Sequence, residues 1–367
     1  MFSKKDKNKY HHKKFMKLAL SLARNSNGFT GENPSVGCVI TKNNKIISYA
    51  STGINGVPHA EAIALKKINK NTKGSNVYVS LEPCSHFGKT PPCTSALISS
   101  KIKNVFYAST DYDERTRNRA QIILKKRKIN TFPGLLKKEG DKFYEKHNFS
   151  KLKKIPYVIG KLACSKNFKI FNNKNYITNK YSRKLSHLLR YQNKGILTSH
   201  KTINSDNPKL NCRINGLIKF SPHIFIIDKN LMIKKRSTII NQNQAKVYIF
   251  HSCKDKKKIN FFKSKKIKLI YLNKYSNNKK NLLLILSIIY KNKINTLLLE
   301  SGPNLLNSFL ISNLINEFYL FRSNNDIKPD SSTVLSIKSL LNNIKLSFKF
   351  KKKINTNLDK DELIHYY

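Results

Sequence analysis

The chain has 367 residues, with 71 Lys and Arg against 20 Asp and Glu, so its formal net charge is +51. This length suits two ordinary domains, each able to bury its own core, and a hydrophobic content of 39% supports globular folding. The longest apolar run, LLLILSIIY from Leu282, is far shorter than the ~20 residues that cross a bilayer. We therefore expect no membrane segment.

The positive charge raises nucleic acid as a partner. The lysines, however, are scattered from end to end rather than gathered beside aromatic residues. We interpret them as a compositional bias and expect a solvated lysine surface without a specific nucleic-acid partner. The six cysteines show no disulfide framework, and the first residues, MFSKKDKNKYHH, lack the apolar centre of a signal peptide. These features predict a cytoplasmic protein.

The first half of the chain alternates between helix and strand patterns. Apolar residues share one face over residues 13–24, which predicts a helix. Two strand-like runs then flank Asn43 and Asn44, a pair that tolerates positive φ, so residues 33–51 should form a hairpin. Helices are expected from His59, from Cys93 and over residues 121–126, with the strands VYVSL and NVFYAST between them. This order indicates an α/β sheet that is covered on both faces.

One stretch, from His59 to Cys93, carries the chemistry. A catalytic zinc takes three protein ligands and keeps its fourth position for water, and His59, Cys84 and Cys93 would supply the three. Glu61 lies two positions after His59, close enough to take a proton from water and pass it to a departing amine. Together these residues predict hydrolysis of an exocyclic amino group on a nucleobase-like ring.

Other interpretations of the same residues are a hydrogen-bonded structural histidine, small buried cysteines, or a disulfide between Cys84 and Cys93. A structural zinc would need a fourth protein ligand, and His86 is the only nearby candidate. The combination with Glu61, and a Pro-Cys pair after a strand, favours the catalytic interpretation.

The motifs NPSVGCVI, PHAE and LEPCSHFGKTPPC resemble the deaminase half of the bifunctional riboflavin-biosynthesis deaminase and reductase. In particular, SHFGKTPP separates two thiols that stand closer together in most zinc base deaminases. The resemblance implies a cytidine-deaminase-like fold and gives Asn33 a contact with the pyrimidine; a turn residue that caps its own backbone is the alternative. Where the family has DPNPxVxGxG, this chain has DYDERTRNRA from Asp111. Arginine side chains would therefore have to bind an anion there in place of the backbone amides of a Gly-rich turn.

A charged stretch over residues 141–155, closed by Pro156, predicts the boundary between domain 1–150 and domain 151–367. Beyond it, β-branched runs of strand length indicate a second α/β sheet. TLLLESGPNLL predicts a strand, a turn and a helix, and with SDNP at Ser205 it resembles the reductase half of the same enzyme. That resemblance implies a dihydrofolate-reductase-like domain that uses NADPH.

The resemblance also implies residue roles in this second domain. The expected NADPH contacts are Ala163, Tyr176, Thr202, Asp206, Gly302, Pro303, Asn304, Leu305, Leu306, Asn307 and Ser308. The expected substrate contacts are Lys174, Arg190, Leu210, Arg213 and Glu300. Of these, Arg190 and Arg213 would suit a sugar phosphate, because a guanidinium fork meets its oxygens in pairs.

The sequence therefore predicts a zinc- and NADPH-dependent bifunctional enzyme of riboflavin synthesis that acts on a pyrimidine ribonucleotide. A homo-oligomer is kept as a hypothesis, and its interface would lie in the carboxy-terminal tail. The rival hypotheses are a tRNA or other nucleic-acid deaminase, and an RNA-binding protein with a structural zinc.

Overall fold

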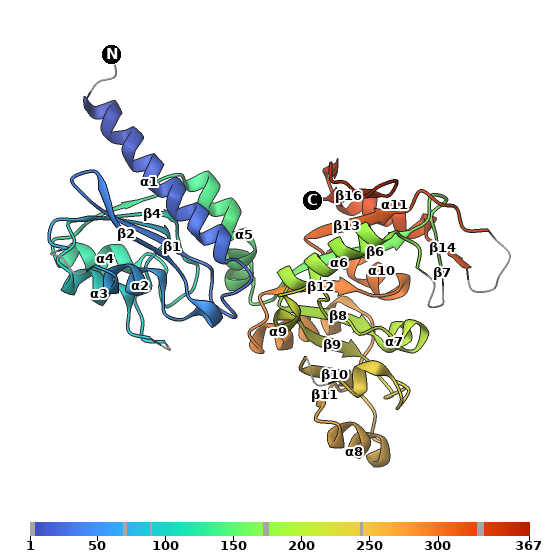
Figure 1. Ribbon diagram of the computed structural model, residues 1–367. Helices are drawn as coiled ribbons and strands as arrows, with labels where there is room; N and C mark the ends of the chain where they lie inside the picture. Colours follow the sequence, from blue (N-terminus) through green and yellow to red (C-terminus); the bar gives the residue numbers. More distant parts are fainter. Residues whose placement is uncertain (1–3, 69–71, 89, 172–175, 243–244, 329–333) are drawn as a thin grey trace. The chain divides into compact units, whose positions relative to one another are not determined.

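The computed structural model describes residues 4–68, 72–88, 90–171, 176–242, 245–328 and 334–367. The chain divides into two compact units, Met1–Lys154 and Ile155–Tyr367 (Figure 1). No helix in the described residues is both long enough and apolar enough to span a membrane.

Unit 1 is built on a five-stranded sheet in the order β2-β1-β3-β4-β5. Its elements are α1 (Lys4–Ser26), β1 (Gly37–Lys42), β2 (Lys45–Ser51), α2 (Ala60–Lys66), β3 (Asn76–Leu81), α3 (Cys93–Ser99), β4 (Asn104–Ser109), α4 (Arg119–Lys126), β5 (Asn130–Pro133) and α5 (Lys137–Lys153). The expected hairpin is β1 and β2, and Asn43 and Asn44 at its turn both have positive φ. From β3 onwards the strands are parallel.

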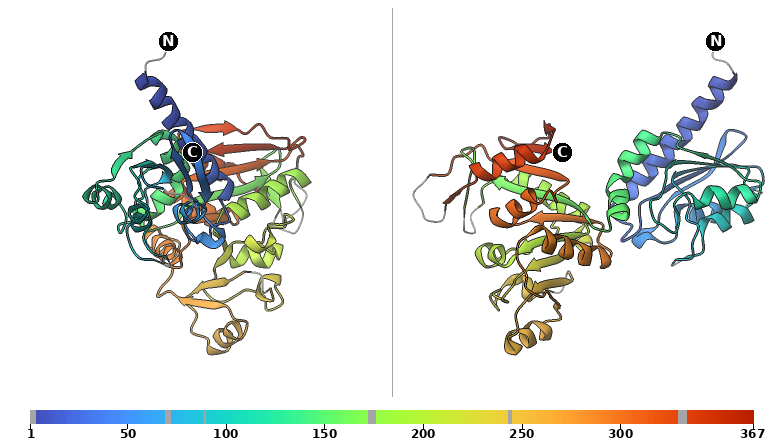
Figure 2. Two further views of the ribbon diagram at one scale, coloured as in Figure 1. Left: turned by 60° about the vertical axis from the view of Figure 1, so that its left-hand side comes forward. Right: turned by 180° about the vertical axis from the view of Figure 1, so that it is seen from behind.

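Helices cover both faces of this sheet, as the alternating pattern predicts. On one face, Met16 and Leu20 of α1 pack against Val39 and Tyr78. Figure 2 shows α1 and α5 side by side there. On the other face, Ala64 of α2, Leu97 of α3 and Leu124 of α4 join the second core of the unit. The carboxyl end of β3 and the amino ends of α2 and α3 therefore come together, because parallel strands and the helices between them alternate in direction.

Two helices differ from what the sequence pattern indicates. The first helix begins at Lys4 in the described residues rather than near residue 13. Most of the charged stretch 141–155 is helical, because α5 runs to Lys153 and buries Tyr144 and His147. A stretch rich in charge conceals a helix when only one narrow stripe of its surface is buried.

Unit 2 contains a nine-stranded sheet in the order β11-β10-β9-β8-β12-β6-β13-β16-β15. The strands are β6 (Tyr157–Cys164), β7 (Lys169–Phe171), β8 (Gly195–Ser199), β9 (His223–Ile227), β10 (Val247–His251), β11 (Lys268–Tyr271), β12 (Thr296–Glu300), β13 (Glu317–Arg322), β14 (Val334–Ser336), β15 (Lys351–Lys353) and β16 (Glu362–Tyr366). The helices are α6 (Lys180–Gln192), α7 (His200–Asp206), α8 (Lys256–Ser264), α9 (Lys279–Lys291), α10 (Pro303–Ile311) and α11 (Lys338–Ser347).

The first seven strands in this spatial order, from β11 at the edge of the sheet to β13, are parallel to one another. The last two strands, β16 and β15, extend the sheet in antiparallel fashion. β7 and β14 form a separate antiparallel pair. The central strands are almost continuously apolar, as expected of parallel strands buried on both faces. Their carboxyl ends share one edge, and β12, a turn at Gly302 and α10 form the predicted strand, turn and helix there.

Candidate active sites

Three elements bring His59, Cys84 and Cys93 together. His59 is the N-cap residue of α2, Cys84 follows β3, and Cys93 is the first residue of α3. Nδ1 of His59 lies 3.3 Å from Sγ of Cys93 and 3.4 Å from Sγ of Cys84, and the three ligand atoms lie within 4.8 Å of one another. The structure therefore assembles one imidazole nitrogen and two sulfurs around a common point.

The chemistry of this donor set fits zinc. All six cysteines are free thiols, so no disulfide joins Cys84 and Cys93. A hydrogen bond with the Cys93 thiol lowers the pKa of Cys84 to about 4, and the backbone amide of Cys93 also donates to its sulfur at 3.2 Å. His86 is not part of the cluster found among the described residues, and its Nδ1 is hydrogen-bonded to Oγ1 of Thr116. With three protein ligands among the described residues, the set has the composition of a catalytic site.

Glu61 lies in the first turn of α2 and is only 3% exposed. Burial, followed by the nearby charge of Cys84, raises its pKa to about 7. A carboxyl group with a pKa near neutrality can both accept and return a proton.

Asn33 precedes β1, and its Nδ2 donates a hydrogen bond of 2.9 Å to the carbonyl of Gly56. The side chain is half-buried. The hydrogen bond fixes the orientation of the amide, and the contact with a pyrimidine stays a prediction.

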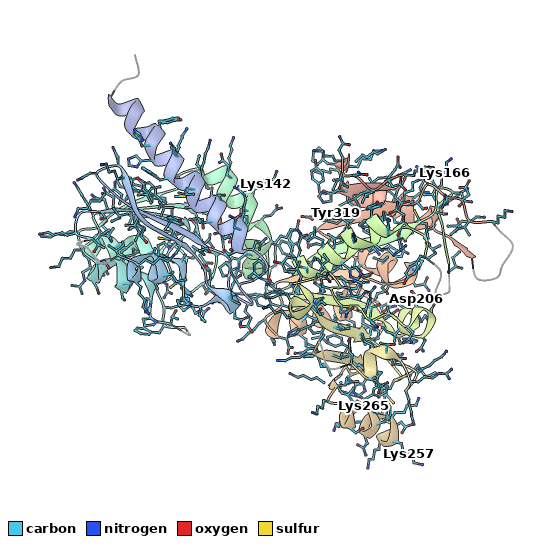
Figure 3. The ribbon with its side chains drawn as sticks, viewed as in Figure 1. Lys142, Lys166, Asp206, Lys257, Lys265 and Tyr319 are labelled. Atoms are coloured by element: carbon cyan, nitrogen blue, oxygen red, sulfur yellow. The ribbon has the colours of Figure 1, made fainter. Side chains whose placement is uncertain are left out.

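The second candidate site is a cavity of about 510 Å³ in unit 2, at the edge where the parallel strands end. Most of the predicted NADPH and substrate residues line it: Ala163, Tyr176, Arg190, Thr202, Asp206, Leu210, Arg213, Glu300, Gly302, Pro303, Asn304 and Leu305. Asp206, labelled in Figure 3, is the last residue of α7. The structure thus gathers residues that are up to about 140 positions apart in the chain.

Three predicted NADPH residues lie elsewhere. Leu306 is fully buried in the hydrophobic core of unit 2. Asn307 accepts a hydrogen bond from Asn343 of α11, and the hydroxyl of Ser308 donates to the carbonyl of Asn304. All three follow the first turn of α10, where side chains and amides are engaged within the helix and core. Lys174 lies outside the described residues.

Arg190 lines the cavity and also bonds to its neighbours there. Nε and Nη2 of Arg190 donate to the two carboxylate oxygens of Glu300 at 3.0 and 2.8 Å, and Nη1 donates to the carbonyl of Asn211 at 3.2 Å. The guanidinium fork thus bonds a carboxylate and a carbonyl in this structure, and its contact with a sugar phosphate stays a prediction. Arg213, whose side chain makes one long hydrogen bond to Asn211, remains available for an anion.

Several cavity residues were not predicted from the sequence, among them three that carry or stack a charged or titratable group. Lys161 places Nζ 3.4 Å from Oε1 of Glu300, and Arg183 stacks over the ring of Tyr176 at 4.3 Å. His187 lines the cavity too, and burial lowers its pKa to about 4, which keeps it neutral. Lys161 could have been predicted from the sequence, because it is the one charged residue in the otherwise apolar strand YVIGKLAC.

The folds and sites together define a zinc-dependent deaminase of the cytidine-deaminase class joined to a reductase domain that is dihydrofolate-reductase-like. Two family models match: the cytidine and deoxycytidylate deaminase zinc-binding region over residues 9–109, and the RibD C-terminal domain over residues 167–323.

The chain is 33% identical to the riboflavin biosynthesis protein RibD of Aquifex aeolicus over 359 residues, which cover 96% of this chain and 98% of that protein. It is also 33% identical to RibD of Buchnera aphidicola over 320 residues, covering 84% and 85% of the two chains. The chain belongs to the RibD family.

Solved structures agree with this assignment. Acinetobacter baumannii RibD matches over 98% of this chain and 99% of its own, with a TM-score of 0.82 at 23% identity, which supports the fold. A deaminase/reductase from Thermotoga maritima matches over the same shares, with a TM-score of 0.78 at 26% identity. The predicted fold class, bifunctional enzyme class and cofactors, zinc and NADPH, are confirmed, and the two rival hypotheses are not favoured.

Proposed function

We propose that unit 1 hydrolytically deaminates 2,5-diamino-6-(5-phosphoribosylamino)pyrimidin-4-one. We also propose that unit 2 reduces the ribosyl group of 5-amino-6-(5-phosphoribosylamino)uracil to ribityl with NADPH. The observation that carries the first assignment is the cluster of His59, Cys84 and Cys93 beside the buried carboxyl of Glu61. The similar Thermotoga maritima protein is a diaminohydroxyphosphoribosylaminopyrimidine deaminase and 5-amino-6-(5-phosphoribosylamino)uracil reductase. We assign the two reactions to residues 1–150 and 151–367 of this chain.

In the deaminase site, His59, Cys84 and Cys93 would hold zinc, which supplies Lewis acidity toward water when it is bound. Glu61 would take one proton from that water and deliver a proton to the amino group that leaves as ammonia. Its burial keeps the pKa near neutrality, so both proton transfers occur without a large free-energy cost. Asn33 would orient the pyrimidine through its amide.

In the reductase site, NADPH would supply a hydride. The backbone amides of Asn304 and Leu305 would meet its phosphates at the start of α10, where the helix dipole favours an anion, and Gly302 and Pro303 would shape the turn beside them. Ala163, Tyr176, Thr202 and Asp206 would contact the remainder of the dinucleotide. We keep Leu306, Asn307 and Ser308 only as residues that support this turn.

On the substrate side, Arg213 would bind the sugar phosphate, and Leu210 would contact the pyrimidine. Glu300 is held as an anion by Arg190 and Lys161, both within hydrogen-bonding distance. Lys161 would donate the proton that accompanies the hydride, because its ammonium group lines the cavity beside Glu300. Lys174 remains a predicted substrate contact.

We further infer that the partners are small molecules, with no specific nucleic acid. Lysines on α5 and α8, such as Lys142 and Lys257 in Figure 3, lie on both units rather than in a single groove. Six free cysteines support a cytoplasmic location. A homo-oligomer is supported by the edge strand β15 and its flanks, where Phe350 is 61% and Tyr367 49% exposed.

The test is metal analysis combined with turnover of the diaminopyrimidine nucleotide, with and without NADPH. We expect one zinc per chain, release of ammonia without NADPH, and oxidation of NADPH only after deamination. A chelator should stop ammonia release but not reduction of the deaminated nucleotide. Ammonia release from RNA but not from the free nucleotide would overturn the proposal.

A further inference from the structure

Glu82 is a buried acidic residue that the two sites do not use. It follows β3, two residues before Cys84, and is 3% exposed. None of the ion pairs found among the described residues includes it. A buried carboxyl group in such a place must be stabilised by hydrogen bonds to its oxygens.

Three backbone amides supply those hydrogen bonds. Oε2 accepts from the amides of Asp111 and Asn118 at 3.3 and 3.2 Å, and Oε1 accepts from the amide of Ala120 at 3.3 Å. These donors stand at the two ends of residues 111–120, the segment that reads DYDERTRNRA. A single carboxyl group therefore bonds to both ends of this segment, which we call the 111–120 loop.

The same contact compensates for a missing cap on α4. Asn118 precedes the helix with a φ of 59°, and its side chain makes no capping hydrogen bond. The first amides of a helix have no partners within the helix, so an acceptor oxygen placed there satisfies them. Glu82 provides from another strand what a local N-cap side chain would otherwise provide.

The 111–120 loop is also attached to the segment that carries the zinc ligands. The hydroxyl of Ser85 donates to the carbonyl of Arg115 at 3.0 Å, and His86 bonds to the buried hydroxyl of Thr116 at 3.1 Å. Glu82, Ser85 and His86 flank Cys84 in sequence. The loop is therefore fixed to the chain on either side of a zinc ligand.

Inside the loop, the side chains are arranged by their own contacts. Asp113 accepts two hydrogen bonds from the side chain of Arg115, at 2.9 and 2.8 Å, and one from Lys151. Arg117 is exposed and stacks over Tyr112 at 4.8 Å. The loop thus presents arginines to solvent on a backbone that Glu82 anchors at both ends.

We propose that Glu82 is a positioning residue of the deaminase site, which holds the 111–120 loop in place as a wall for the phosphorylated nucleotide. This inference rests on the deaminase function proposed above. The loop lacks the prolines and glycines of the resembled motif, and three hydrogen bonds to one carboxyl group hold its two ends.

Glu82→Gln tests the proposal with little change in shape. The amide nitrogen of Gln cannot accept a hydrogen bond, so at least one of the three backbone amides loses its partner. We expect the KM of the nucleotide to rise about tenfold, which corresponds to about 1.4 kcal/mol of lost binding, with kcat changed less than about threefold. Zinc content and the reductase rate of the same chain should equal those of the wild type.

Hydrogen exchange gives a readout that does not depend on activity. In Glu82→Gln the amides of residues 111, 118 and 120 should exchange faster, while those of β3 and α2 should not change. The matched control is Glu139→Gln, which makes the same substitution at an exposed position in the first turn of α5. It should alter neither exchange nor KM.

Two outcomes would contradict the proposal. One is an unchanged KM together with unchanged exchange in the 111–120 loop. The other is a rise in KM that follows loss of zinc, because Glu82 would then support the metal site rather than the loop. If the wild type releases no ammonia from the nucleotide, the deaminase proposal fails, and exchange still decides whether Glu82 holds the loop.

Discussion

Arg190 and Glu300 bind each other. Two hydrogen bonds of 3.0 and 2.8 Å join the guanidinium group to the carboxylate, and their side chains are 11% and 15% exposed. The family resemblance implied that both residues line the substrate. In the structure they form one charged cluster at the cavity, and Lys161 is its third member.

Breaking the ion pair between Arg190 and Glu300 should destabilise unit 2. Arg190→Met leaves the Glu300 carboxylate buried with only Lys161 beside it, and removal of one partner of a buried pair costs about 3–5 kcal/mol. Denaturant unfolding of the full chain, followed by circular dichroism, would measure the loss. The double variant Arg190→Met/Glu300→Gln should lose less than the sum of the two single variants, and simple additivity would contradict the coupling.

The same pair predicts a pH dependence of stability. The charges of Arg190 and Lys161 overcome the effect of burial and hold the pKa of Glu300 well below its usual range. A carboxyl group with a lowered pKa in the folded state stabilises the protein above its unfolded pKa of about 4.3, and this contribution is lost as the pH falls below that value. The free energy of unfolding should thus fall more steeply between about pH 5 and pH 3 in the wild type than in Glu300→Gln. Equal slopes would show that Glu300 is not stabilised as an anion.

Glu61→Gln should abolish ammonia release and leave the zinc content intact. Gln keeps the shape of Glu61 but cannot carry a proton between water and the leaving amine, so the expected loss of kcat is on the order of 10²-fold or more. Metal analysis and ammonia assays of the same preparation would check both parts. Near-normal turnover would mean that another group is the base.

Arg213→Ala should raise the KM of the reductase substrate about tenfold or more, with little effect on deamination. Arg213 lines the cavity, and its guanidinium is not bonded to Glu300. Steady-state oxidation of NADPH with the deaminated nucleotide is the measurement. Lys257→Ala, on α8 and outside the cavity lining, is the control for a lost positive charge (Figure 3). Parallel loss of both activities in Arg213→Ala would contradict the separation of the sites.

Gly160→Ala should destabilise unit 2 by about 1–3 kcal/mol, the usual cost of overpacking. A Cβ at Gly160 of β6 would stand 2.4 Å from Cδ2 of Phe318 in the neighbouring strand β13, and Phe318 is fully buried. Gly302→Ala is the matched control, because the nearest atom to its added Cβ, Oγ1 of Thr202, lies at 3.9 Å. This control should keep wild-type stability in denaturant unfolding. An equal loss in both variants would show that the contact with Phe318 is not the cause.

The local elements followed from the residues themselves. Asn43 and Asn44 predicted a turn because both tolerate positive φ, and the apolar runs predicted the parallel strands of both units. The cluster that could hold a metal was also predicted in advance, since one histidine and two cysteines with a nearby glutamate form a set that few other functions need.

Only the tertiary structure decided which partner each charged group has. Arg190 and Glu300 are 110 positions apart, and Glu82 reaches amides 29 to 38 positions away, so no local pattern could pair them. Local periodicity reports which face of an element is buried, whereas a hydrogen bond depends on positions to within a few tenths of an ångström. The residue types alone thus predicted the chemistry of the deaminase site. In the reductase site, the partner of each charged residue was decided by the way the strands meet at one edge of the sheet.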